Sequence, residues 1–164
     1  MNPRNTLAAA FVSASLIAVA VVVSHGQPGK NSASPDAPKA VLARLGEIQN
    51  AAQALDPDKV FSFVLENDQG ALVQNGKLFR TRSEALASTR QGFQGLQKVS
   101  YRFDEQQVAL LSPTIALAVG AGESSMTLDD GKTLNTRFVQ SVVLVLTNGE
   151  WKVFHAHRSF PPAK

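Results

Sequence analysis

Two histidines near the C-terminus are the residues whose type and spacing most favour chemistry. His155 and His157 lie two residues apart in "GEWKVFHAHRSF", residues 149–160, and the 164-residue chain contains one further histidine. Imidazole titrates close to neutral pH, so the pair suits proton transfer, hydrogen bonding to a ligand or metal coordination. The last segment of the chain is therefore the first candidate for a functional site.

This segment has the period-two pattern of a β-strand, in which every second side chain projects from the same face. Four residues would then share one face: Trp151, Val153, His155 and His157. A stripe that runs from apolar to polar is typical of a cavity with an apolar floor and a polar wall. We therefore predict that this face of the strand lines a ligand cavity.

Three interpretations of the histidine pair remain open. His155 and His157 are neutral core residues that bond neighbouring backbone or Tyr101, or they contact a ligand as donor or general base, oriented by a carboxylate. Asp104 and Glu105 are the candidates for that carboxylate. A metal site is the least favoured, because zinc needs a third protein ligand and the only other histidine lies in the N-terminal leader. We expect neither a metal nor a cofactor.

The composition excludes several classes of function. The chain has 16 Lys and Arg against 13 Asp and Glu. Residues 1–26 contain one of these charges, Arg4, so the remainder carries 15 basic and 13 acidic side chains, a net of +2. The basic residues are scattered, and nucleic-acid binding is not expected. With no cysteine, the chain has no disulfide, thiolate metal site or cysteine nucleophile.

The N-terminal segment predicts export. In residues 1–26, Arg4 precedes an uncharged stretch rich in Ala and Val, and small residues follow it. This order is typical of a secretory signal peptide, with an uncleaved membrane anchor as the alternative. Either way the rest of the chain is expected to be periplasmic or secreted, with membrane contact only through an uncleaved leader.

The remaining chain is interpreted as a linker followed by one domain. Residues 27–39 are rich in Pro, Ser and Gly, which predicts a flexible linker, and the domain is expected to span residues 40–160. Hydrophobic periodicity and capping signals predict three helices, over residues 37–56, 57–67 and 81–96. Asn75-Gly76 between two short apolar stretches predicts a β-hairpin.

From residue 97 onward the period changes to two, which predicts four antiparallel strands. Helices followed by a meander indicate an α+β fold, with helices on one face of the sheet. The stretch "FVQSVVLVL", residues 138–146, is apolar on both faces. Because the helices cover one face, we expect a second subunit on the other, in a homodimer or larger homo-oligomer.

The sequence "NGEWKVFHAHRSFPP" resembles the closing strand of the association domain of calcium/calmodulin-dependent protein kinase II. The matching positions are Gly149, Trp151, Val153, His155, His157, Arg158 and Ser159. The wider group is the nuclear transport factor 2-like superfamily, which includes the SnoaL-like proteins. The resemblance covers about residues 40–160 and extends to the order of the helices, hairpin and strands.

This resemblance implies a cone-shaped α+β fold, in which a strongly curved antiparallel sheet wraps around N-terminal helices and leaves a pocket. It also implies oligomers formed through the sheet. The kinase domain has a pocket arginine whose position falls at Val142 here, and Arg137 is out of register with it. That arginine is therefore not carried over. The superfamily contains isomerases, cyclases, dehydratases and scaffolds, so the fold alone does not assign a function.

Our hypothesis is an exported SnoaL-like protein that binds a small, partly apolar organic ligand in its conical pocket without catalysis. The expected ligand-binding residues are His155, His157, Trp151, Tyr101 and Phe61. One alternative is an acid–base enzyme, such as an isomerase, cyclase or dehydratase, that uses the two histidines. The other is an oligomerisation scaffold whose cone is filled by its own side chains.

Overall fold

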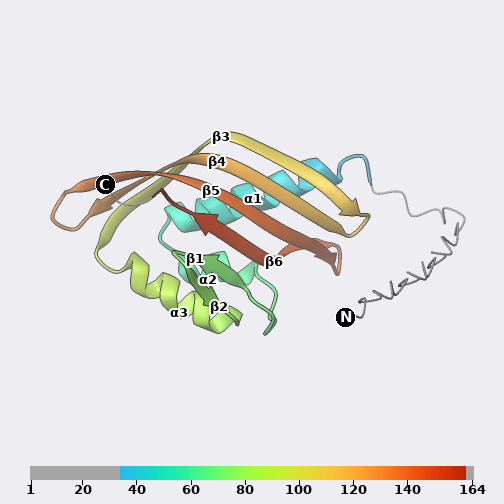
Figure 1. Ribbon diagram of the computed structural model, residues 1–164, viewed down its shortest axis with the longest axis horizontal. Helices are drawn as coiled ribbons and strands as arrows, with labels where there is room; N and C mark the ends of the chain where they lie inside the picture. The colour runs from blue at the N-terminus through green and yellow to red at the C-terminus, as the bar shows by residue number, and fades with distance from the viewer. Residues whose placement is uncertain (1–33, 162–164) are drawn as a thin grey trace, which may run out of the picture. The chain divides into compact units, whose positions relative to one another are not determined.

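Six strands form one curved, unclosed sheet in the computed structural model, which describes residues 34–161 (Figure 1). The strands are β1 (Leu72–Gln74), β2 (Lys77–Phe79), β3 (Leu96–Ser112), β4 (Ile115–Leu128), β5 (Thr133–Thr147) and β6 (Glu150–Ser159). Their order is β2-β1-β6-β5-β4-β3, and every pair is antiparallel except β1 with β6. The predicted α+β fold and its four-stranded meander are confirmed.

Three helices accompany the sheet: α1 (Ala37–Gln53), α2 (Pro57–Ser62) and α3 (Arg82–Phe93). α1 packs along one face of the long strands, while α2 and α3 lie beside the β1–β2 hairpin (Figure 1). The core between α1 and the sheet includes Val41 and Leu144, both without exposed surface. Within residues 34–161, no helix is long and apolar enough to cross a membrane.

Two local signals behave as the sequence predicts. Thr81 and Glu84 form a reciprocal capping box at the start of α3, in which the Thr81 hydroxyl accepts from the Glu84 amide at 3.2 Å. Asn75 and Gly76 connect β1 to β2 with positive φ angles of 53° and 71°, as a two-residue turn with this handedness requires. The capping box fixes the start of α3, and the two-residue turn fixes the hairpin.

The second helix is shorter than predicted. Asp56 caps it as expected, but α2 ends at Ser62 instead of continuing to residue 67. The chain then runs beside β6: Val153 donates its N–H to the Phe63 carbonyl at 2.9 Å and accepts from the Leu65 amide at 2.8 Å. Pairing with the sheet therefore replaces the last helical turns.

β6 contains a β-bulge that the sequence pattern does not reveal. Val143 of β5 pairs with His155, but the next residue, Leu144, pairs with Val153, which leaves Phe154 without a partner. A bulge of this kind places two residues opposite one, so the alternation of faces is reversed across it. On β6, the odd-numbered residues therefore face inward before Phe154, and the even-numbered residues face inward after it.

The prediction that Trp151, His155 and His157 share one face is wrong for this reason. Before the bulge, Trp151 faces the core with α1. After it, the even-numbered residues Ala156 and Arg158 face inward, because they pair with inward-facing residues of β5. The register places His155 and His157 with the outward-facing residues of β5.

Candidate functional site

A cavity of about 720 Å³ lies between the helices, the hairpin and the concave face of the sheet. Much of its wall is aromatic, from Phe61, Phe79, Phe93, Tyr101, Phe103 and Phe160. Phe61 and Phe79 come from α2 and β2 and are nearly buried, at 6% and 8% exposure. The cavity is the size of a typical small-molecule site and has the apolar wall of one.

A polar row crosses this apolar concave face. The strand register aligns one residue from each of the six strands, in the order Lys77, Gln74, Arg158, Gln140, Gly120 and Gln106. All of them except Gly120 line the cavity. The row gives the cavity a band of amide and cationic groups on a mostly apolar surface.

Arg158 is the central residue of this row and is half-buried. Its Nη2 and Nε atoms donate to the Gln140 side-chain oxygen at 2.8 and 3.3 Å. Its guanidinium carbon lies 5.1 Å from the centre of the Tyr101 ring and 5.0 Å from that of Phe138. The two rings hold the guanidinium by cation–π contacts, while Gln140 fixes its orientation.

Tyr101 is positioned by α1. The Tyr101 carbonyl accepts from the Gln49 side chain at 2.9 Å, and its amide donates to Gln53 at 3.0 Å. These bonds hold the free edge of β3 against the helix and leave the ring packed edge-on against Phe138, at 6.1 Å between centroids. Among the described residues the phenol hydroxyl forms no hydrogen bond, so it can bond to a ligand in the cavity.

The charge of the lining is one-sided. The described residues that line the cavity include two cations, Lys77 and Arg158, but no Asp or Glu. Neither cation belongs to any ion pair formed within residues 34–161. A partly desolvated guanidinium without an acidic partner has the charge and the paired N–H donors that suit an anion.

Sequence comparison assigns the domain. The family model of the SnoaL-like domain matches residues 41–163. The chain belongs to the SnoaL-like family. No curated protein matches this SnoaL-like chain.

Solved structures with the same fold belong to the nuclear transport factor 2-like superfamily. A superfamily protein from Salmonella enterica serovar Typhimurium has a TM-score of 0.69 and 15% identity, covering 76% of this chain and 91% of that one. A proposed dehydratase from Streptomyces avermitilis gives 0.68 and 17%, with coverages of 76% and 96%. A proposed calcium/calmodulin-dependent protein kinase II association domain from Xanthomonas campestris gives 0.67 and 19%, with 76% and 87%. At these identities the likeness shows the fold alone.

The SnoaL-like cavity brings together some of the sequence-predicted site residues. Phe61 and Tyr101 line it, and the exposed His157 borders it although the strand register places His157 with outward-facing residues, whereas Trp151 and His155 do not line it. Trp151 is 5% exposed and belongs to the core beneath α1. The predicted site therefore divides into cavity, core and outer-face residues.

The two histidines make separate contacts. The Nδ1 atom of His155 lies 2.8 Å from the Gly70 carbonyl and must donate, because a carbonyl oxygen only accepts. The Nε2 atom of His157 lies 3.2 Å from the Ser159 hydroxyl. Within residues 34–161, no three His, Asp or Glu side chains are placed to hold a metal ion.

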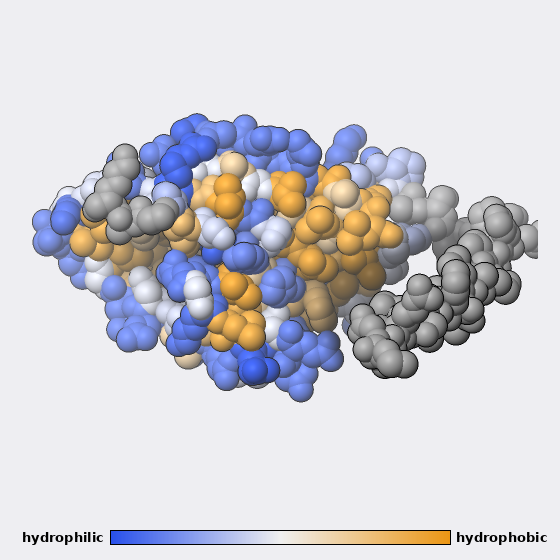
Figure 2. Space-filling model, in the orientation of Figure 1, coloured by the Kyte–Doolittle hydropathy of each residue, from blue (hydrophilic) through white to orange (hydrophobic). Residues whose placement is uncertain are grey.

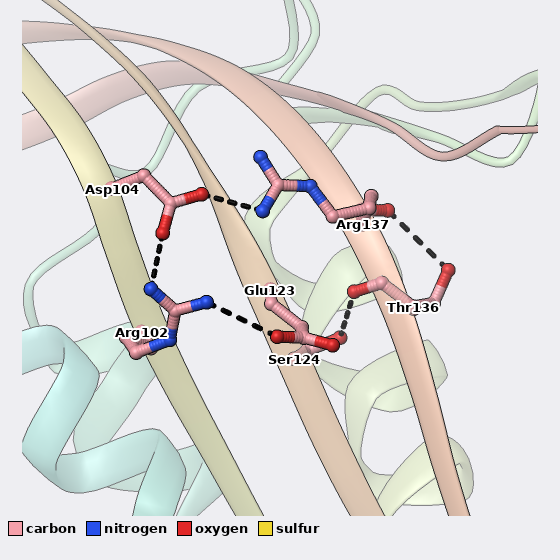
Figure 3. Close-up of polar contacts among 6 residues, drawn as sticks. All are labelled: Arg102, Asp104, Glu123, Ser124, Thr136 and Arg137. Atoms are coloured by element: carbon pink, nitrogen blue, oxygen red, sulfur yellow. Dashed lines mark hydrogen bonds and ion pairs between the residues drawn. The ribbon is translucent and has the colours of Figure 1, made fainter.

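The predicted partnership of a histidine with Asp104 or Glu105 is wrong. Asp104 lies on the outer face of the sheet and accepts from Arg102 and Arg137 (Figure 3). Its hydrogen bond from Arg137 is the main cause that lowers the pKa of the Asp104 carboxyl, and the charge of Arg102 adds to it. Glu105 accepts from Gln107 at 2.6 Å. Both carboxylates are engaged away from the histidines.

Sequence reasoning missed Arg158 and Gln140 as cavity residues of this SnoaL-like domain. Arg158 belongs to the motif that carried the family resemblance, but simple alternation placed it opposite the histidines and outside the cavity. Gln140 interrupts an otherwise apolar strand, and an inward polar residue in such a run is a usable signal. Only the bulge shows that these two side chains lie on the same face.

Proposed function

We propose that this chain is an exported SnoaL-like protein that binds a small, partly apolar organic anion in its cone without catalysing a reaction. The observation that carries the proposal is Arg158, a half-buried guanidinium in the cavity with no acidic partner among the described residues. Guanidinium binds carboxylate through paired N–H donors, and these bonds are stronger where water is displaced. The aromatic wall suits the apolar body of such a ligand.

Two features support binding over acid–base catalysis and over a scaffold role. The described residues of the lining include no carboxylate, and His157 is the only histidine among them. His157 is exposed and its Nε2 atom contacts the Ser159 hydroxyl, and no carboxylate among the described residues bonds to its ring to orient it as a general base. The volume of about 720 Å³ argues against a cone filled by its own side chains.

Export and self-association are part of the same proposal. Export rests on residues 1–26, which lie outside the described residues. Self-association is supported by the outer face of the sheet, where Val119 and Val139 are 41% and 56% exposed. Figure 2 shows apolar side chains gathered over the strands on the face turned away from α1. An apolar surface of this kind is stabilised when a second copy covers it.

The test compares a charged and a neutral probe of the same shape. The wild-type protein is titrated calorimetrically with biphenyl-para-carboxylate and with the corresponding carboxamide. We expect the acid to bind more tightly, and Arg158→Gln to weaken it about 10- to 100-fold, since a hydrogen bond to a charged group contributes about 1.5–3 kcal/mol. The carboxamide should be much less affected by the substitution.

Arg137→Gln is the matched control, because it removes a guanidinium from the outer face of β5 and leaves the cavity intact. It should bind both probes as the wild type does. Circular dichroism and urea unfolding confirm that both variants are folded. Equal affinities of wild type and Arg158→Gln for the acid would contradict the proposal.

A further inference from the structure

A second cation lies in the polar row, two strands away from Arg158. Gln74 of β1 pairs with Lys77 on one side and with Arg158 on the other. Neighbouring strands are about 4.8 Å apart, so the backbones of the two cationic residues are about 10 Å apart along the row. The separation is set by the sheet itself and not by flexible loops.

The hairpin places Lys77 at the cavity. The two-residue turn at Asn75-Gly76 puts Lys77 opposite Gln74, and Phe79, two residues further on, shares its face. Phe79 is nearly buried in the cavity wall, and the Lys77 ammonium lies 4.8 Å from the centre of its ring. Lys77 is exposed and lines the cavity. It is therefore a cation on the water-accessible part of the wall.

Gln74, between the two cations, and Gln140, on the other side of Arg158, add hydrogen-bonding groups to the row. The Gln74 side chain forms no hydrogen bond among the described residues, so its amide is available. Gln140 uses its oxygen for Arg158, which leaves its N–H donors for a ligand. No carboxylate of the described lining competes for these donors.

We propose that the row from Lys77 to Arg158 binds a ligand with two acidic groups, one at each cation, and an apolar body between them. This inference rests on the proposed function, because Arg158 is the anchor in both. Lys77 would bind a second acidic group of the ligand, at a distance from the first that the spacing of Lys77 and Arg158 sets. The row thus selects elongated diacids over monoacids of the same shape.

The test uses two biphenyl acids that differ by one carboxylate. Biphenyl-para-carboxylate and biphenyl-para,para′-dicarboxylate are titrated into the full chain; the acids of the second span a distance comparable with two strand spacings. We expect the wild type to prefer the diacid by about 10-fold, as a charge-assisted hydrogen bond implies. Lys77→Gln should remove the preference for the diacid over the monoacid.

Lys132→Gln, in the turn between β4 and β5, is the control for a general loss of positive charge. It should keep the preference for the diacid. A wild type that binds both acids equally, or a Lys77→Gln variant that still prefers the diacid, overturns this inference alone. Arg158→Gln binding the monoacid as wild type does, or no binding of either acid by wild type, overturns the proposed function and this inference together.

Discussion

The two faces of the sheet use the same side chain, arginine, in opposite ways. On the outer face, Arg102 and Arg137 both donate to Asp104, and Arg102 also donates to Glu123 at 3.2 Å (Figure 3). On the concave face, the side chain of Arg158 bonds to no described residue other than the neutral Gln140, and it lies against two aromatic rings. The guanidinium groups of Arg102 and Arg137 are paired with carboxylates, whereas that of Arg158 has no acidic partner within residues 34–161.

The charges of Arg102 and Arg137 are used in ion pairs within the sheet, whereas the charge of Arg158 is available to a ligand. The outer residues are well exposed, with Arg102 and Arg137 side chains at 67% and 56%, and ion pairs exposed to this degree contribute little to stability. Arg158 is partly withdrawn from water, where an unpaired charge is costly. An anionic ligand would offset that cost, which is the physical basis for proposing that a ligand binds at the concave face.

The largest expected effect compares neighbouring residues of β5 that project from opposite faces. Phe138 is 2% exposed and packs edge-on against Tyr101 and Phe103. Phe138→Ala should lower the free energy of unfolding by about 3–5 kcal/mol, because it leaves a cavity in the core. Arg137→Ala removes a side chain of similar size from the outer face and should cost no more than about 1 kcal/mol.

Urea unfolding of both variants measures this contrast. The outer network is the set of ion pairs among Arg102, Asp104, Glu123 and Arg137. Similar losses of unfolding free energy for Phe138→Ala and Arg137→Ala would mean that this network is as important for stability as the core, and the distinction between the two faces would fail.

The second prediction concerns the apolar part of the outer face. Val139→Lys introduces a charge into the surface that we propose a second copy covers, and desolvating that charge opposes association. The dissociation constant of the oligomer should rise at least about 10-fold, which corresponds to 1.4 kcal/mol. Light scattering over a range of concentrations measures the mass. Asn135→Lys, on the same strand and face but at an exposed polar position, should leave the mass unchanged.

Local signals predicted much of the fold but not the face of β6. The capping box at Thr81, the Asn75-Gly76 turn and the long alternating strands each depend on residues close in sequence, and all were predicted correctly. The bulge at Phe154 depends on distant residues. Its carbonyl accepts from the Asn67 side chain at 3.1 Å, across 87 positions of the sequence. No pattern within β6 contains that information.

The bulge also lies where β6 changes its neighbour. Val64 bridges to Val153 on one side of Phe154, whereas Leu72 of β1 pairs with Ala156 on the other. The segment that follows α2 and the first residue of β1 therefore pair with β6 on opposite sides of the bulge. Arg158, which follows the bulge, could therefore not be predicted as a cavity residue from the alternation of β6. Tyr101 and Phe61 lie on other elements, and the bulge does not affect their prediction.

The smallest expected effect is the pH dependence of the outer network. Hydrogen bonding from Arg137, with the charge of Arg102, lowers the pKa of Asp104 in the folded protein below its ordinary value. The unfolded state therefore binds more protons between the two pKa values, so stability rises with pH across that window. The contribution of Asp104 is complete above the unfolded pKa of about 3.9 and is lost as pH falls through the lower folded value.

Asp104→Asn should accordingly be less stable than wild type at neutral pH, and the difference should shrink as the medium is acidified through that window. Urea midpoints of both proteins at successive acidic pH values measure this. Because the pairs are exposed, 1 M salt, with a Debye length of about 3 Å, should reduce the difference at neutral pH. Asp68→Asn, at an exposed residue with no ion pair within residues 34–161, serves as the control. A difference that persists unchanged at strongly acidic pH would show that Asp104 acts through packing and not through its charge.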